Sequence, residues 1–327
     1  MRYLITGGAG FIGSNLAHYL LEQEKDSSII ILDDFSTGTM RNIDDIKGTN
    51  RVDIINDSVL NYDIVFQLMQ KCDFVYHFAS SVGVKYILDN PIKSLDSNIM
   101  GSRVVFEIAS KLGKRVIFSS SSEVYGKNTA VPYYEDDDKI IGATSVQRWS
   151  YSIAKSLSEY YALAYSQVGL NVDILRFFNI VGPKQIGDYG MVLPNFINKA
   201  LKGDDIVIHG DGTQKRCFTY VNDVSDICYL FSKLPKSTNG IYNVGNNVST
   251  SINELADLVI ETTKSNSKKI YISYEQAYGK KFEDCMNRCP CIDKLLDLFN
   301  GYEFTNLETI IRNIVEHINE NSTENII

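Results

Sequence analysis

Thr6-Gly7-Gly8-Ala9-Gly10-Phe11-Ile12-Gly13 is the stretch that decides the fold, because it stands between an apolar run at 2–5 and a helical pattern at 14–22. Gly7 permits a tight turn, and Gly10 lets the backbone approach a pyrophosphate held by the amides that open the helix. Gly13 allows the helix to pack closely against the strand. The stretch therefore predicts a dinucleotide-binding turn between a first strand and a first helix.

Carboxylates follow the next two strand-like runs. Asp33 and Asp34 come directly after the run at 28–32, and Asp57 follows the run at 52–55. A carboxylate after the second strand accepts hydrogen bonds from the adenosine ribose and repels a 2′-phosphate, so it favours NAD over NADP. Asp57 is predicted to meet the adenine amino group. The alternative, that the two aspartates only end a strand in a turn, is weaker because the glycine turn precedes them.

Short apolar runs alternate with helical patterns through the first half of the chain, which predicts βαβ units and a parallel sheet covered on both faces. The predicted strands are 2–5, 28–32, 52–55, 74–78, 115–118 and 172–175, and the predicted helices are 14–22, 94–112 and 150–168. The expected fold is α/β, a Rossmann-type doubly wound sheet.

Glycine and proline become more frequent after residue 178, where short strands (206–208, 270–273) mix with helices (194–201, 251–263, 306–317). This change predicts a smaller mixed α/β lobe that binds the substrate. We expect an NAD-binding domain over 1–178, with 215–245 returning to it, and a second lobe formed by 179–214 and 246–327.

The composition of the 327-residue chain excludes several classes of protein. With 40 acidic and 32 basic side chains the net charge is −8, which argues against a nucleic-acid binder. No apolar run approaches the ~20 residues of a membrane span, and no leader pattern opens the chain, so we expect a cytoplasmic protein with no membrane partner. The acidic run at 135–138 is expected to form a solvated loop.

Six cysteines are too few for a disulfide scaffold in a chain of this length. Three of them, Cys285, Cys289 and Cys291, lie close together, but C-x3-C-x-C is not a common zinc spacing and the four histidines are scattered. We therefore expect reduced thiols and no metal.

Tyr151 and Lys155 lie one turn apart on one face of a predicted helix. A free tyrosine, with a pKa near ~10, is a poor base at neutral pH. A neighbouring ammonium and a positive nicotinamide ring would lower that pKa, and the lysine can also hold the nicotinamide ribose. The pair is common by chance, but the stretch Ser119-Ser120-Ser121-Ser122-Glu123 follows the fifth strand and should lie near the same cleft.

Together these motifs resemble an extended short-chain dehydrogenase/reductase of the nucleotide-sugar epimerase/dehydratase/decarboxylase family, over nearly the whole chain. The resemblance is carried by residues 6–14, 33–34, 77–80, 120–126, 151–155, 176–179, 210–216 and 220–224. It implies a homodimer. It also implies that NAD contacts Gly7, Gly10, Phe11, Ile12, Gly13, Asp33, Asp34, Asp57, Ala79 and Lys155.

The resemblance further implies a shared first step. Tyr151 takes the proton from the sugar 4-hydroxyl while C4 gives a hydride to NAD⁺, Ser121 hydrogen-bonds the same oxygen, and Lys155 tunes Tyr151. The 4-keto sugar can then be reduced from its other face (4-epimerisation), lose water across C5–C6 (4,6-dehydration), or lose carbon dioxide if C6 is a carboxylate.

Residues beside the catalytic serine bear on this choice of reaction. Ser122 stands where many dehydratases of the family carry an aspartate, and Glu123 where simple 4-epimerases carry a small neutral residue. The Ser-Glu pair and Arg288 resemble nucleotide-hexuronate decarboxylases, whereas the segments 147–150 and 189–193 depart from them. A UDP-sugar 4-epimerase is the first expectation, a UDP-glucuronate decarboxylase-type lyase the second, and a 4,6-dehydratase the third.

The resemblance also places the nucleotide. Asn179 is expected at the diphosphate, with Arg216 and Arg288 as its arginine partners. Val192 is expected in the substrate site. His209 stands where an aromatic ring often stacks on uracil, which makes UDP the first expectation, with GDP, CDP and dTDP as the alternatives. Two other hypotheses are a nucleotide-sensing regulator that has lost catalysis and a reductase that releases NAD(P)H at each turnover.

Overall fold

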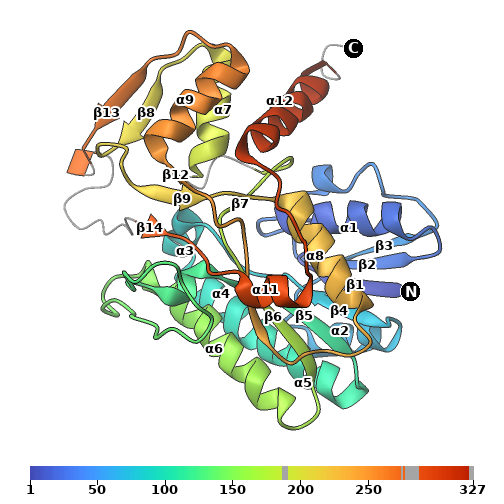
Figure 1. The fold of residues 1–327 in the computed structure, drawn as a ribbon. Helices are drawn as coiled ribbons and strands as arrows, with labels where there is room; N and C mark the ends of the chain where they lie inside the picture. The colour runs from blue at the N-terminus through green and yellow to red at the C-terminus, as the bar shows by residue number, and fades with distance from the viewer. Residues whose placement is uncertain (186–190, 274, 277–286, 324–327) are drawn as a thin grey trace.

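A central sheet of parallel strands organises the computed structural model, which describes residues 1–185, 191–273, 275–276 and 287–323 (Figure 1). In the described chain this sheet has seven strands, in the order β11-β6-β5-β4-β1-β2-β3. They are β1 (Arg2–Thr6), β2 (Ser28–Asp33), β3 (Val52–Asn56), β4 (Phe74–His77), β5 (Arg115–Ser121), β6 (Asn171–Phe177) and β11 (Ile241–Val244). The strand order reverses direction between β1 and β4, which makes the sheet doubly wound, as predicted.

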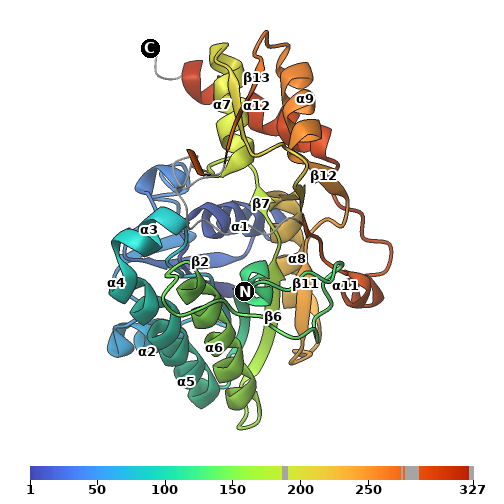
Figure 2. The same cartoon turned by 90° about the vertical axis from the view of Figure 1, so that its left-hand side faces the viewer.

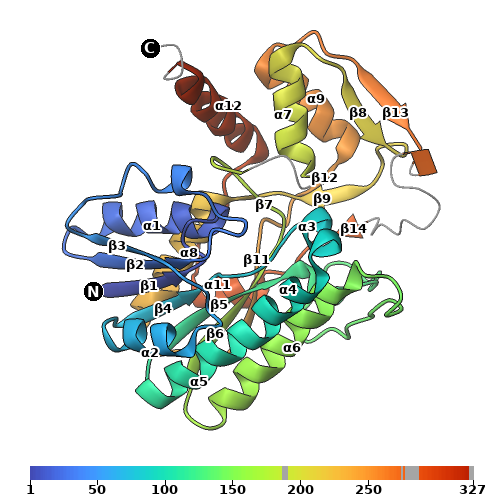
Figure 3. The ribbon, with the colours of Figure 1, turned by 180° about the vertical axis from the view of Figure 1, so that it is seen from behind.

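Helices cover both faces of the sheet. They are α1 (Phe11–Gln23), α2 (Tyr62–Gln70), α3 (Val84–Asp89), α4 (Pro91–Leu95), the π-helical turn η2 (Asp96–Gly101), α5 (Ser102–Leu112), α6 (Trp149–Ser166) and α8 (Val221–Lys233), with short 3₁₀ turns η1 (Met40–Asn42) and η3 (Ser122–Tyr125). Figures 2 and 3 show α2, α5 and α6 side by side on one face. Helices α1 and α8 pack together on the other face.

Alternate residues of each strand belong to different cores, because side chains point to opposite faces of a sheet. Ile29 and Ile31 of β2 pack into the cluster shared with α1 and α8. Ile30 and Leu32 pack into the cluster shared with α2, α5 and α6. All four side chains are buried, which explains why the sequence shows a continuous apolar run rather than an alternating one.

The prediction of one regular helix over 94–112 is wrong. The chain forms α4, then η2, then α5, and the π-helical turn inserts extra chain into the helical ladder. Close packing explains the glycine at the junction: a Cβ on Gly101 would lie 2.6 Å from the Val59 side chain. The first helix also begins at Phe11, earlier than predicted, since the glycine turn leads directly into it.

A smaller lobe lies beyond the sheet, in the upper part of Figure 1. Its elements are β7 (Ile180–Val181), α7 (Val192–Lys202), β8 (Ile206–His209), β9 (Lys215–Cys217), β10 (Thr219–Tyr220), β12 (Ser249–Ser251), α9 (Ile252–Thr263), β13 (Lys269–Ile272), β14 (Asn287–Arg288) and α12 (Leu307–Thr323). The short helix α11 (Asp293–Leu298) instead contacts β11 of the main sheet. The strands pair as β10-β7, β13-β8 and β12-β9-β14. The exact division into two domains stays a prediction. Strand β11 does belong to the main sheet, and α8 packs against α1 on one of its faces.

Neither a membrane span nor a metal cluster is found in the part of the chain that the structure describes. None of the helices there is long and apolar enough to cross a bilayer. No group of three or more His, Cys, Asp or Glu side chains among those residues is arranged to hold a metal ion. Cys285, one of the three clustered cysteines, lies outside the described residues.

Candidate active site

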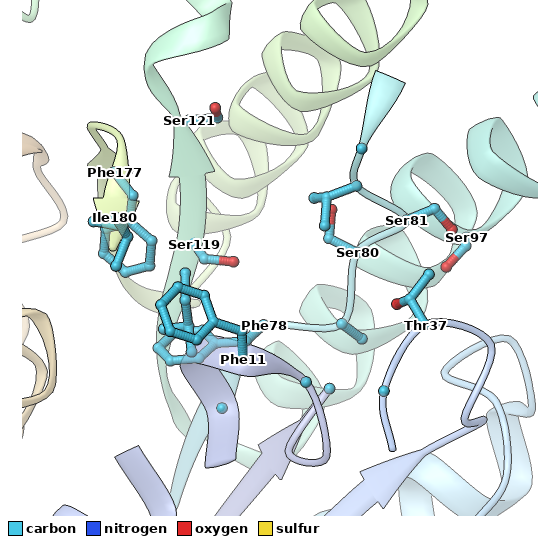
Figure 4. Close-up of a pocket in the computed structure, with 18 of the residues that line it drawn as sticks. Phe11, Thr37, Phe78, Ser80, Ser81, Ser97, Ser119, Ser121, Phe177 and Ile180 are labelled. Carbon is cyan, nitrogen blue, oxygen red and sulfur yellow. The ribbon is translucent and has the colours of Figure 1, made fainter. Parts of the chain in front are cut away.

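A deep pocket of about 460 Å³ opens at the carboxyl ends of the parallel strands, where ligands of doubly wound sheets bind. Figure 4 shows Phe11, Phe78, Phe177 and Ile180 along one part of its wall and the hydroxyls of Thr37, Ser80, Ser81 and Ser97 along another. The pocket brings together most of the predicted site residues: Gly7, Gly10, Phe11, Ile12, Gly13, Asp33, Asp34, Asp57, Ala79, Ser121, Ser122, Glu123, Tyr151, Lys155, Asn179 and Arg288.

The glycine turn leaves a cradle of bare backbone at the start of α1. A Cβ on Gly13 would lie 2.3 Å from the Gly7 carbonyl oxygen, and a Cβ on Gly7 would lie 2.7 Å from the Ala79 nitrogen. No side chain among the described residues caps the start of α1 at Gly10, so its first amides remain available to an anion. These features fit a dinucleotide pyrophosphate.

The acidic residues after β2 lie where the adenosine half of a dinucleotide would reach. Asp33 is buried, and its carboxylate accepts hydrogen bonds from the backbone nitrogens of Ala9 and Phe35, both at 2.9 Å. Burial raises the pKa of Asp33, and these backbone donors oppose that rise. Asp34 and Asp57 also line the pocket, and the Asp57 carboxylate accepts from the Asn61 amide at 3.1 Å.

Tyr151 hydrogen-bonds with two serine hydroxyls, Ser80 after β4 and Ser121 at the end of β5. Burial raises the pKa of Tyr151 to about 12, and the two serines oppose the rise. The prediction that a neighbouring ammonium and the nicotinamide ring lower this pKa concerns the NAD-bound enzyme and stays a prediction. Desolvation has the larger effect, and Lys155 donates to the Ser119 carbonyl oxygen, at 2.7 Å.

Lys155 is buried one helical turn beyond Tyr151. Burial lowers the pKa of Lys155 to about 7, and the negative charge of Glu159 opposes part of that decrease. The ammonium also lies 4.8 Å from the centroid of the Phe118 ring. A lysine with a pKa near neutrality changes charge in response to small changes around it, which suits a group that accompanies a proton transfer.

A buried ionic network anchors the helix that carries these two residues. Glu159 accepts two hydrogen bonds from Arg176 at 2.9 Å, one from Lys139 at 2.6 Å and one from Ser120 at 2.5 Å. Burial by itself would raise the pKa of Glu159, but the Arg176 guanidinium and the Lys139 ammonium hold it below its usual value. The network fixes α6 against β5 and β6.

The expectation that 135–138 is a solvated loop is wrong for Glu135. This residue is 8% exposed, its carboxylate accepts from the Asn243 backbone nitrogen at 2.8 Å, and its carbonyl accepts from Arg176 at 2.7 Å. The sequence did not predict this role of Glu135, because its partners on β6 and β11 are distant in sequence.

Glu123 faces Arg288 across the mouth of the pocket. The Arg288 Nη1 atom lies 2.5 Å from the Glu123 Oε1 atom. Burial would raise the pKa of Glu123, yet Arg288, Arg148 and Arg216 together lower it. Arg288 and Arg148 line the pocket with Glu123 and Tyr151, and the charge of Arg216 also acts on this carboxylate from the neighbouring strand β9.

Three predicted substrate residues are not part of the pocket wall. Val192 begins α7 and packs against the core, and His209 ends β8. Arg216 lies on β9, paired in register with Arg288 of β14. Substrate contacts for these three residues stay predictions.

Sequence reasoning missed the roles of Ser80, Asn98 and Arg148. Asn98 of η2 accepts hydrogen bonds from the Ser80 hydroxyl and the Ser81 nitrogen, both at 2.9 Å, and so positions a serine that contacts Tyr151. Arg148 lines the pocket three residues before Tyr151, and its place at the N-cap of α6 could have suggested it. No sequence signal pointed to Asn98, since its partners are set by the π-helical turn.

Known proteins resemble this chain over almost its full length. A family model described as the NAD dependent epimerase/dehydratase family matches residues 3–245. UDP-N-acetyl-alpha-D-glucosaminuronate decarboxylase of Bacillus cytotoxicus is 39% identical over 321 residues, covering 98% of each chain.

Solved structures show the same similarity. UDP-glucose 4-epimerase of Thermotoga maritima superposes with a TM-score of 0.84 at 28% identity, covering 98% of this chain and 100% of that one. UDP-glucuronic acid 4-epimerase of Bacillus cereus superposes with a TM-score of 0.86 at 25% identity, covering 98% of this chain and 99% of that one. The chain thus belongs to the NAD-dependent epimerase/dehydratase family and is an enzyme that uses NAD to modify nucleotide sugars.

Proposed function

We propose that this enzyme decarboxylates a UDP-linked hexuronate, with UDP-N-acetylglucosaminuronate as the first candidate, through a 4-keto intermediate. The observation that carries the proposal is the group of three arginines, Arg148, Arg216 and Arg288, around Glu123 beside Tyr151. The full-length similarity to the Bacillus cytotoxicus decarboxylase supports it.

The charges around Glu123 favour an anionic sugar. Arg148 and Arg288 line the pocket beside Glu123, and Arg216 lies next to Arg288 on the neighbouring strand, so the positive charges outnumber the Glu123 carboxylate here. A nucleotide diphosphate would neutralise part of this charge, and a C6 carboxylate would neutralise more. Arg288 can exchange its ion pair with Glu123 for a planar, two-point contact with a substrate carboxylate.

The hydroxyl cluster would serve the chemistry at O4. Bound NAD, held by the glycine cradle and the acids after β2, would supply the hydride acceptor. Tyr151 would take the O4 proton, and the Ser80 and Ser121 hydroxyls would favour its phenolate. Oxidation at C4 makes the C6 carboxylate part of a β-keto acid. When carbon dioxide leaves, negative charge develops on O4, where Tyr151 and Ser121 can donate hydrogen bonds to it.

A UDP-sugar 4-epimerase, the first expectation from the sequence, remains the second candidate. The similarity to the two 4-epimerase structures favours it, and one of those proteins acts on UDP-glucuronic acid by its name. The Tyr151, Ser121 and Lys155 arrangement serves both reactions, because both begin with the same oxidation. The fate of the 4-keto sugar separates them.

Incubation of the purified protein with a set of UDP-sugars tests the proposal. The set contains UDP-N-acetylglucosaminuronate, UDP-glucuronate and the corresponding neutral sugars, and products are followed by mass spectrometry and proton NMR. We expect carbon dioxide loss from a uronate and no turnover of the neutral sugars. An unchanged mass with an altered C4 signal would establish epimerisation instead.

We also propose a homodimer in the cytoplasm. Ile153, Leu157 and Tyr160 form one exposed apolar strip on α6, at 36%, 39% and 67% exposure, and Ile92 of α4 is 75% exposed. A second copy of the chain packed on this strip would cover it. Light scattering of the wild type and of Leu157→Glu tests this, with a monomer expected for the variant. The cytoplasmic location rests on the cysteine usage of the sequence, which is too sparse for a disulfide scaffold.

A further inference from the structure

Two cysteines meet on the small sheet behind the arginines. Strand β14 pairs with β9 in parallel, with Asn287 opposite Lys215 and Arg288 opposite Arg216. Cys217 is the last residue of β9, and Cys289 directly follows β14. On its other side Cys217 is opposite Ser249 of β12. Figure 1 shows these short strands side by side between the two lobes.

The two faces of this sheet have different surroundings. Arg288 lines the catalytic pocket. A separate groove of about 720 Å³ is lined by the neighbouring residues Lys215, Ser249, Asn287 and Cys289. Since side chains alternate along a strand, the cysteines face away from the pocket that Arg288 enters.

The two thiols differ in access. Cys217 is completely buried, whereas Cys289 is partly exposed and opens onto the groove. A molecule in solution can therefore reach Cys289 directly, whereas Cys217 is closed to it.

The thiols are also in contact. Cys217 donates a hydrogen bond to the Cys289 sulfur, which lowers the pKa of Cys289 to about 7. The same contact raises the pKa of Cys217, and its burial adds to the rise. A thiolate is the reactive form of cysteine, so Cys289 combines reactivity with access. Cys72, by contrast, is buried, and burial raises its pKa to about 11, so this thiol is neither reactive nor accessible.

We propose that Cys289 and Cys217 form a reversible disulfide when the enzyme meets a hydroperoxide. The Cys289 thiolate attacks one peroxide oxygen, the O–O bond breaks, and a sulfenic acid forms as water or an alcohol leaves with a solvent proton. The Cys217 sulfur then attacks the Cys289 sulfur. The S–S bond forms as the S–O bond breaks, and the Cys217 proton leaves with the hydroxyl as water.

The strand geometry permits this bond. Neighbouring strands lie about 4.8 Å apart, which is within the range of Cα separations that disulfides span. A disulfide here would join β9 to β14 directly behind Arg216 and Arg288. Such bonds in reducing compartments are usually transient and redox-sensing.

Peptide mapping after oxidation tests the proposal. The NAD-bound enzyme is treated with a small excess of hydrogen peroxide, alkylated, digested without reduction and analysed by mass spectrometry. We expect a cross-linked peptide that joins Cys217 to Cys289. Its mass should be two hydrogens below the sum of the two free peptides, and it should disappear after reduction with dithiothreitol. The rate should rise about tenfold from pH 6 to pH 8, since the Cys289 pKa is about 7.

Cysteine variants separate this pair from other thiols. Cys217→Ser should leave a Cys289 sulfenic acid that dimedone traps, and Cys291→Ser should form the bond as the wild type does. The proposal is overturned if Cys289 links to another cysteine, or if both thiols stay free while Cys291 is oxidised. This test does not depend on the sugar substrate, so its result is independent of the proposed decarboxylation.

Discussion

Replacing Glu159 with glutamine should destabilise the protein strongly although the two side chains have nearly the same shape. Glu159 is buried and accepts four hydrogen bonds, three of them from the cations Arg176 and Lys139. The amide removes the negative charge and leaves both cations without their counter-ion. Removing one partner of a buried ion pair costs about 3–5 kcal/mol.

That free energy converts into a measurable shift of the melting temperature. An unfolding entropy of about 2.1 cal/mol/K per residue gives roughly 0.7 kcal/mol/K for this chain, so we expect Tm to fall by about 4–7 °C. Circular dichroism melting at pH 7.5 measures the shift. Glu308→Gln is the matched control. Its ion pair with Arg312 is exposed and four residues apart on a helix, so its loss should cost less than about 0.5 kcal/mol.

The pH dependence gives a second test of the same network. Because the folded protein lowers the pKa of Glu159, the carboxylate contributes its stability above the unfolded value of about 4.3 and loses it as pH falls through the folded pKa. The Tm difference between wild type and Glu159→Gln should be constant from pH 8 to 6 and shrink below about pH 4. A variant that melts within about 1.5 °C of the wild type at pH 7.5 would refute the assigned role of the buried charge.

Three further substitutions test the site. Tyr151→Phe should reduce kcat more than about a hundredfold in a stopped assay with the active UDP-sugar, since an acid–base group is lost; near-normal turnover would remove Tyr151 from the mechanism. Gly13→Ala should purify with little bound NAD by absorbance and mass analysis, because its Cβ would lie 2.3 Å from the Gly7 carbonyl oxygen; full occupancy would show that the turn can shift. Arg288→Met should raise KM for a uronate by about tenfold or more, given the roughly 1.5–3 kcal/mol of a charged hydrogen bond, and should affect a neutral sugar less; equal effects on both would place Arg288 at the diphosphate alone.

Local sequence patterns predicted the parts of the fold that local chemistry controls. The glycine turn, the buried strands and the helix of Tyr151 and Lys155 each have a short-range signature, and the parallel sheet follows from their order. The pocket also gathers Asp33, Asp34 and Glu123, because parallel strands all end at one edge of the sheet.

Features that depend on distant partners were not predictable in this way. Glu135 belongs to an acidic run that looks solvated, and only the fold reveals its partners on β6 and β11. The pKa of Tyr151 depends on burial, which the sequence does not display. The glycine at the junction of η2 and α5 packs against Val59, a residue more than forty positions away, so its packing role could not be seen locally.

The π-helical turn at 96–101 acts as a spacer whose length sets the position of a reacting group. Its Asn98 side chain holds the Ser80 hydroxyl, and its Asn98 carbonyl accepts from Ser102 and Ser158 on two different helices. Each residue added to or removed from a helix rotates what precedes it by about 100°. Deleting one residue here would restore an unbroken α-helix and swing Asn98 away from Ser80. A deletion that makes the helix more regular would thus break the contact by which Asn98 positions Ser80 beside Tyr151.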